Sequence, residues 1–242
     1  MRKLLFTAVI LLAMSITGSY AQNKKVAVIT FYISKQIDVS DFGVAAKAAA
    51  LSLSDEPDFN LTPLIVNFHD QFFSTYSKNF PFDLAPESEV LDKPEYRNYV
   101  PLFDPTGDPA NQLKYNIPYD GYKIIINWGE DANIKNMLAL FNQYDGVMKV
   151  TIGFRLLQYG FNNMGVARMM AGATIELYNR DDVRVFSISD NGKSKSVSPM
   201  VAGVPVMTPS KVLPMCQDAL DHLMTELNKD LPKLIKKANA KL

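Results

Sequence analysis

The longest regular pattern in the chain is an alternation of apolar and polar residues in its second half. Residues 148–156 alternate strictly between apolar side chains and small or polar ones, and residues 167–178 repeat the pattern. A third run, 183–189, follows a cluster of turn residues. Because side chains alternate across a strand, a period of two predicts strands with one buried face. We therefore predict an antiparallel meander over residues 147–189.

Strands and helices are also predicted before and after the meander. Residues 25–32 (KVAVITFY) are almost continuously apolar, which is typical of a strand covered on both faces. Residues 122–127 (YKIIIN) predict a second buried strand, and Asn191-Gly192 predicts a turn. Helix-start residues and helical spacing predict helices at 44–53, 62–76, 131–141, 208–227 and from Pro232 onward.

The segment 79–116 differs from the rest because it is rich in proline, aspartate and aromatic residues. Short helices are predicted at 87–91 and 94–99. We interpret the segment as an ordered insertion, since its aromatic side chains provide surface to bury. Together the elements predict one α/β domain of α+β character over residues 22–242. Its mixed sheet has about five to six strands and is covered by helices.

Residues 1–21 have the pattern of a secretory signal peptide. Two basic residues precede an apolar run, 4–16, that is too short for a comfortable membrane span. Small residues end the run and predict cleavage between Ala21 and Gln22; an uncleaved membrane anchor is the alternative. No later stretch has the roughly 20 apolar residues of a spanning helix. We expect an exported chain, periplasmic or extracellular, with no transmembrane helix in its mature form.

Composition excludes several classes of protein. The chain is 48% hydrophobic and 21% charged, which indicates a globular protein. Loss of the signal peptide removes two basic residues from 25 basic and 25 acidic ones, so the net charge is about −2. We therefore expect no nucleic-acid partner. Cys216 is the only cysteine, so no intramolecular disulfide forms, and its apolar neighbours predict a buried residue rather than a nucleophile.

Motifs for catalysis, metal binding and cofactor binding are missing from the sequence. His69 and His222 are the only histidines, and neither has the spacing of a zinc site. There is no serine nucleophile elbow, no P-loop and no dinucleotide fingerprint. We therefore predict no catalytic residue, no metal site and no cofactor.

One candidate ligand site comes from strand ends. Tyr32 and Lys35 close the first predicted strand, and Trp128 and Glu130 follow residues 122–127. In open α/β sheets, ligands bind beyond the carboxyl ends of strands, so these four residues form a candidate ligand pocket. The alternative is that Trp128 packs within the structure.

The order of these elements resembles a family of exported domains. The resemblance rests on three segments: VAVITFY, YKIIIN and ATIELYNRDDVRVFSIS. Within the last, residues 173–179 fit the pattern A-x-[IL]-x-[LV]-[YFV]-[DN]. These resemble the α/β domains of the curli-assembly lipoprotein family and the amino-terminal domain of the Tol-system periplasmic protein. The resemblance covers about half the chain and implies an envelope-associated, non-enzymatic domain. The chain differs from that family in having no lipobox cysteine and in carrying the 79–116 insertion.

We therefore expect an exported, soluble binding or assembly module of the cell envelope. Its partner would be an envelope protein or a small ligand, and its oligomeric state is not predicted. Two alternatives remain at this point. One is a hydrolase, which would need a carboxylate with a raised pKa in a cleft. The other is an oligomer that inserts the hairpin 147–178 into a membrane.

Overall fold

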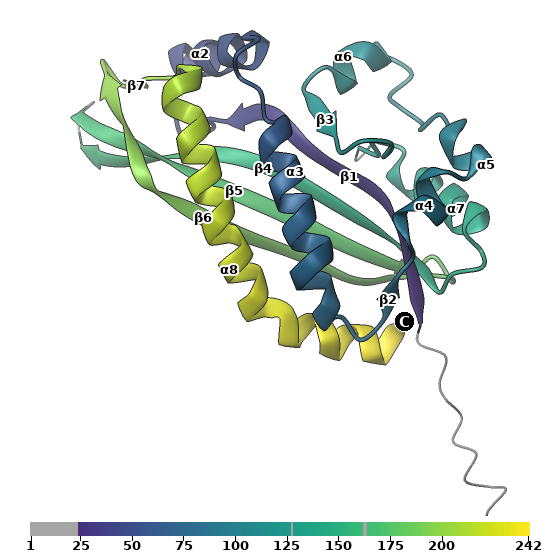
Figure 1. Ribbon diagram of the computed structural model, residues 1–242. Helices are drawn as coiled ribbons and strands as arrows, with labels where there is room; N and C mark the ends of the chain where they lie inside the picture. Colours follow the sequence, from purple (N-terminus) through teal and green to yellow (C-terminus); the bar gives the residue numbers. More distant parts are fainter. Residues whose placement is uncertain (1–23, 127, 162–163) are drawn as a thin grey trace, which may run out of the picture.

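The computed structural model describes residues 24–126, 128–161 and 164–242, so the predicted signal peptide and its cleavage site, Ala21–Gln22, lie outside the described residues. A single curled sheet runs through the molecule, with helices packed against it (Figure 1). Its elements are β1 (Lys25–Asp38), α2 (Val44–Asp55), α3 (Thr62–Gln71), a π-helical turn (Phe72–Tyr76), a 3-10 turn (Ser77–Asn79), β2 (Asp83–Leu84), α4 (Glu87–Leu91), α5 (Pro94–Arg97), α6 (Pro109–Leu113), β3 (Asn116–Pro118), α7 (Glu130–Leu140), β4 (Gly146–Phe161), β5 (Met164–Asn179), β6 (Arg184–Val201), β7 (Val204–Pro205) and α8 (Pro209–Lys241).

The sheet is mixed, which confirms the predicted α/β class. Its strand order is β2-β1-β4-β5-β6-β7. The short strand β3 pairs with residues 32–34 of β1, on the edge opposite β4. β1 runs parallel to β4, whereas β4, β5 and β6 form the predicted antiparallel meander. The meander strands are longer than predicted, since β6 alone extends over 18 residues.

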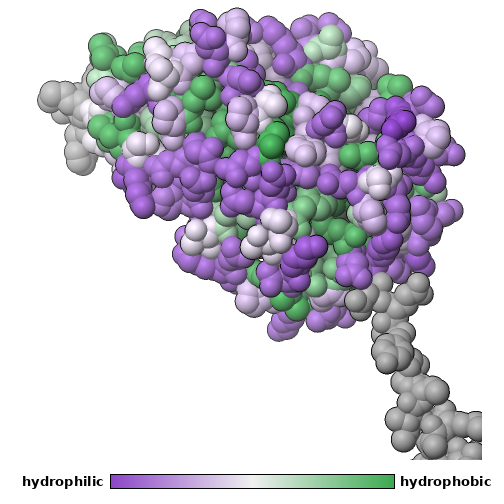
Figure 2. Space-filling model, viewed as in Figure 1, coloured by the Kyte–Doolittle hydropathy of each residue, from purple (hydrophilic) through white to green (hydrophobic). Residues whose placement is uncertain are grey.

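One face of the sheet is fully covered by α2, α3 and α8. Figure 1 shows α3 and α8 lying across the long strands. The apolar positions of the meander are buried here together with the predicted stripe of α8, for example Val150, Ile175 and Leu223. Hydrophilic side chains predominate on the outside of this helix layer, as amphipathic helices require (Figure 2).

The prediction of a separate last helix from Pro232 is wrong. α8 continues through Pro232 to Lys241, and Figure 1 shows its axis bending in the C-terminal part. Proline removes one backbone hydrogen bond and kinks a helix. Here Leu234 and Ala238 beyond it are buried, so packing on the sheet keeps the helix continuous.

The predicted turn at Asn191-Gly192 is also wrong, because β6 runs straight through it. A Cβ atom on Gly192 would overlap the backbone nitrogen of Leu223 and the carbonyl oxygen of Ala219. The glycine therefore allows α8 to approach the sheet closely; it does not reverse the chain direction.

The opposite face of the sheet is covered only at one end. There α4, α5 and α7 pack over a second core that includes Ala27 and Ile29 of β1 and Val147 of β4. The prediction that β1 is buried on both faces is thus confirmed for its first half. Farther along, Tyr32, Ser34 and Asp38 of the same strand line an open hollow.

The predicted strand 122–127 is wrong: residues 122–126 are irregular, and Asn127 lies outside the described residues. The Tyr96 hydroxyl donates to the carbonyl of Ile29 and accepts the N–H of Lys123, both at 2.8 Å. The Thr30 hydroxyl donates to the carbonyl of Lys123 at 2.9 Å. Side chains thus occupy the hydrogen-bonding groups through which this segment would have paired with β1.

Candidate functional site

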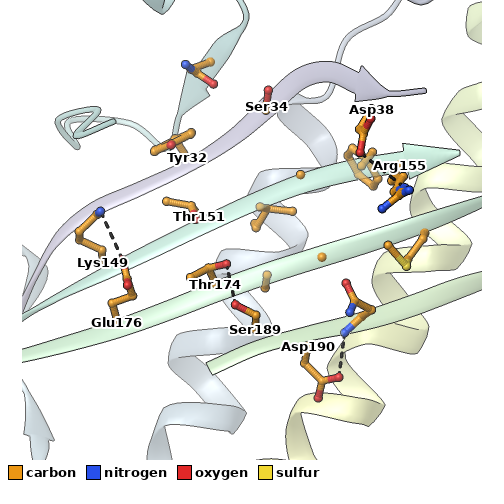
Figure 3. Close-up of a pocket in the computed structure, with 18 of the residues that line it drawn as sticks. Tyr32, Ser34, Asp38, Lys149, Thr151, Arg155, Thr174, Glu176, Ser189 and Asp190 are labelled. Carbon is orange, nitrogen blue, oxygen red and sulfur yellow. Dashed lines mark hydrogen bonds and ion pairs between the residues drawn. The ribbon is translucent and has the colours of Figure 1, made fainter. Parts of the chain in front are cut away.

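The candidate site is the open hollow on the second face of the sheet. Its volume is about 740 Å³, within the range of small-molecule sites. Side chains from β1, β4, β5 and β6 line it, and Figure 3 shows charged groups gathered at its two ends with hydroxyl groups between them.

The floor of the hollow is built from small residues paired across strands. Gly153 of β4 faces Gly172 of β5, and next to them Thr151 pairs with Thr174. Thr174 in turn pairs with Ser189 of β6, and their hydroxyls are 3.2 Å apart. A Cβ atom on Gly153 would meet nothing within 4 Å, so the space above this glycine is empty, whereas the Asn191 side chain lies over Gly172. The hollow exists because these positions carry short side chains.

A buried ion cluster closes one end of the hollow. The Lys149 side chain is only 3% exposed, and its Nζ lies 2.6 Å from Glu130 Oε1 and 3.4 Å from Glu176 Oε2. Arg184 binds the other oxygen of Glu176 at 3.0 Å, and the Tyr178 hydroxyl donates to Glu130 at 3.0 Å. Glu130 is the first residue of α7, so docking of this helix completes the cluster.

The cluster changes the pKa of Glu130 and of the neighbouring Tyr32. Burial opposes ionisation of Glu130, but hydrogen bonds from Lys149 and Tyr178 outweigh it and lower the pKa of this carboxyl. Burial, together with the negative charges of Glu130 and Glu176, raises the pKa of Tyr32 to about 12. At neutral pH Glu130 is therefore ionised, and Tyr32 keeps its proton as a hydrogen-bond donor.

A second charged group marks the other end. Arg155 of β4 lies 3.5 Å from Asp38 of β1 and 2.6 Å from Asp41, which follows that strand. Gly43 takes the N-cap position of α2, so Asp41 is free to pair with Arg155. Both ends of the hollow thus carry cations already bound by carboxylates.

Two of the four predicted ligand residues meet in the hollow. Tyr32 and Glu130 both line it, although Glu130 also serves the ion cluster. Lys35 is not part of its lining, because β1 continues past it and its Nζ donates to the carbonyl of Glu56. Trp128 is 44% exposed and lies outside the lining, so the alternative that it packs within the structure is wrong.

The most buried member of the site, Lys149, was missed from the sequence. Its place in the alternation predicted a side chain in water, but α7 covers that end of the face. The sequence did contain a signal for this ion pair. Lys149 and Glu176 are equally far from the hairpin loop, so they lie opposite one another on paired strands, and they carry opposite charges. Directly opposed residues of opposite charge are a recurrent cross-strand pair.

Other candidate chemistry lies apart from the hollow. His69 lies on α3, where its Nε2 is 2.7 Å from Glu87, and His222 hydrogen-bonds within α8. Cys216 lies on the buried side of α8, and burial raises the pKa of its thiol. Over residues 24–126, 128–161 and 164–242, no cluster of three metal-ligating side chains occurs. Within the same residues, no helix combines the length and apolar character needed to cross a bilayer.

Comparisons with known proteins give little further guidance. No family model matches the chain, and no curated protein is similar to it in sequence. Among solved structures, one similar chain is described as a homolog of a neuraminyllactose-binding hemagglutinin from Helicobacter pylori. The identity is 9%, 91% of each chain is covered, and the TM-score is 0.34. Similarity at this level does not establish a common fold.

Proposed function

We propose that this chain is an exported binding or assembly module of the cell envelope, and that its ligand occupies the hollow between the two charged ends. The export part rests on the signal-peptide pattern of residues 1–21. The binding part rests on one observation: four adjacent strands place short side chains below about 740 Å³ of open space, on a face that helices cover only at one end.

The shape of the hollow supports this proposal because packing alone would not produce it. The same strands bury apolar residues against helices on their other face, whereas a Cβ atom at position 153 would meet no neighbour within 4 Å. Protein interiors are filled to high density, and a preformed concave site with a few polar groups is typical of ligand binding.

The hydrolase alternative receives no support from the titration of this site. A general acid needs a carboxyl group whose pKa is raised, and the pKa of Glu130 is lowered. Lys149 binds Glu130 and Glu176 together, so both carboxylates already have a strong partner. Holding the end of the hollow in shape is the role that this arrangement supports.

Native mass spectrometry of residues 22–242, purified gently from the native envelope, tests the proposal. We expect a stoichiometric extra mass on the wild-type chain. A small mass would indicate a small ligand, whereas a protein-sized one would indicate assembly. Gly153→Trp should abolish the extra mass because the indole fills the hollow.

Val66→Trp is the matched control, since Val66 is 40% exposed on α3, which covers the opposite face. This variant also adds a tryptophan to the surface but leaves the hollow open, so it should retain the extra mass. A bare wild-type chain, or equal retention by both variants, would contradict the proposal. Circular dichroism would establish that both variants are folded.

A further inference from the structure

The charges around the hollow are compensated within the protein. Lys149 and Arg184 bind Glu176 at one end, and Arg155 binds Asp38 and Asp41 at the other. A phosphate or sulfate group would have to compete with these carboxylates for the cations. The same pairing leaves little free negative charge for a polycation. Charge compensation therefore favours a ligand without net charge.

The groups left free to bind are neutral donors and acceptors. Over the described parts of the chain, the hydroxyls of Tyr32 and Thr151 have no hydrogen-bond partner, although both line the hollow. Thr174 and Ser189 bond only to one another. Asn191 of β6 places its neutral amide beside Gly172, with Oδ1 3.0 Å from the position that a Cβ atom on Gly172 would take. Hydroxyls act both as donors and as acceptors, so this set matches a ligand rich in hydroxyl groups.

The middle of the floor adds a flat apolar surface. Gly153 and Gly172 are cross-strand partners, and Met170 pairs with Arg155 beside them. With no side chain on Gly153, a ring can approach the strand backbone closely there, beside the Asn191 amide that lies over Gly172, and the Met170 thioether provides adaptable apolar contact. A pyranose ring presents both an apolar C–H face and equatorial hydroxyls, and so fits a flat floor bordered by hydroxyl groups.

We propose that the hollow binds a neutral oligosaccharide, with a sugar ring over Gly153 and its hydroxyls bonded to Tyr32, Thr151 and Asn191. This inference rests on the proposed function, because it names the ligand class of the same hollow. The open shape suits a chain of sugar units better than a single enclosed sugar, since the hollow extends from the Lys149 end to the Arg155 end (Figure 3).

Isothermal titration calorimetry with separate probes tests the ligand class. The neutral probes are maltotetraose, cellotetraose and tetra-N-acetylchitotetraose, and the charged probes are a sulfated disaccharide and spermidine. We expect saturable binding of at least one neutral probe. Gly153→Trp should weaken it more than about tenfold, and Tyr32→Phe and Asn191→Ala about threefold to tenfold each, as for loss of one hydrogen bond. Val66→Trp should bind like the wild type.

Absence of binding by all three neutral probes would overturn the inference, as would Gly153-sensitive binding of a charged probe alone. The failure of this inference is distinguishable from failure of the proposed function. If the extra mass seen by native mass spectrometry is lost in Gly153→Trp while no neutral saccharide binds, only the ligand class is wrong. If neither the extra mass nor saccharide binding is found, both proposals fail.

Discussion

The two faces of the sheet are built from the same strands but differ in what fills them. On the helix-covered face, even a glycine is packed: Gly192 lies against the backbone of α8 at Ala219 and Leu223. On the opposite face, Gly153 has nothing within 4 Å of a Cβ position. One glycine therefore permits contact between two elements, whereas the other preserves empty space. We conclude that the first face supplies stability and the second is available for binding.

The largest effect should come from closing the space at Gly192. Gly192→Val places three carbon atoms against the α8 backbone, which cannot move without detaching the helix. We expect the free energy of unfolding to fall by about 4 kcal/mol or more, in the range that marks severe overpacking. Urea denaturation would measure it. A loss below about 1 kcal/mol would show that α8 is not held where the structure places it.

The second largest effect should come from the ion cluster at the end of the hollow. Lys149→Met leaves Glu130 and Glu176 facing one another without their shared cation. Breaking a buried ion pair on one side costs about 3 kcal/mol. Lys135→Met, on the exposed side of α7, is the matched control and should be nearly neutral.

A second variant separates charge from packing in this cluster. The triple variant Lys149→Met, Glu130→Gln and Glu176→Gln removes the unpaired carboxylates and should recover most of the lost stability, as measured by the same urea titration. Equal destabilisation in the single and triple variants would mean that lost packing, not unpaired charge, is responsible.

A smaller effect is expected from acid. The pKa of Glu130 is lowered in the folded state, so its contribution to stability is present above its ordinary pKa of 4.5 and is lost as the pH falls through the folded value. The stability difference between wild type and Glu130→Gln should therefore shrink below that pH. Denaturation of both proteins over a pH series would measure it. A difference that grows on acidification would contradict the assigned direction.

The smallest effect on stability should come from Gly153→Val, the counterpart of the first variant on the open face. Valine favours strands more than glycine does, and no neighbour opposes it. We expect a change within about 0.5 kcal/mol, or a slight gain. A loss comparable to that of Gly192→Val would remove the contrast between the two faces.

The sequence predicted elements well where a repeating pattern runs through them. Strict alternation identified the meander and its buried face, and Pro63 and the apolar stripe identified α3 and α8. Local signals failed where distant contacts decide the structure. Asn191-Gly192 resembles a turn, but α8 requires the glycine, and residues 122–126 resemble a strand, but the Tyr96 side chain intervenes.

The candidate site was predictable only in part, for the same reason. Tyr32 and Glu130 were found because they follow or end predicted strands. The floor of the hollow was not predicted, because Thr151, Gly153 and Thr174 have the pattern of ordinary water-facing positions. Only the strand register brings them together. An empty space between strands leaves no pattern in the sequence.

Hydroxyl-radical footprinting would test most directly whether the open face is the binding face. The chain purified gently from the native envelope would be compared with the same chain after unfolding, removal of bound molecules and refolding. Met170 and Tyr32 line the hollow, whereas Met207 packs beside the main core. We predict slower oxidation of Met170 and Tyr32 in the natively purified chain and equal oxidation of Met207. Equal oxidation of all three residues in both samples would contradict the account.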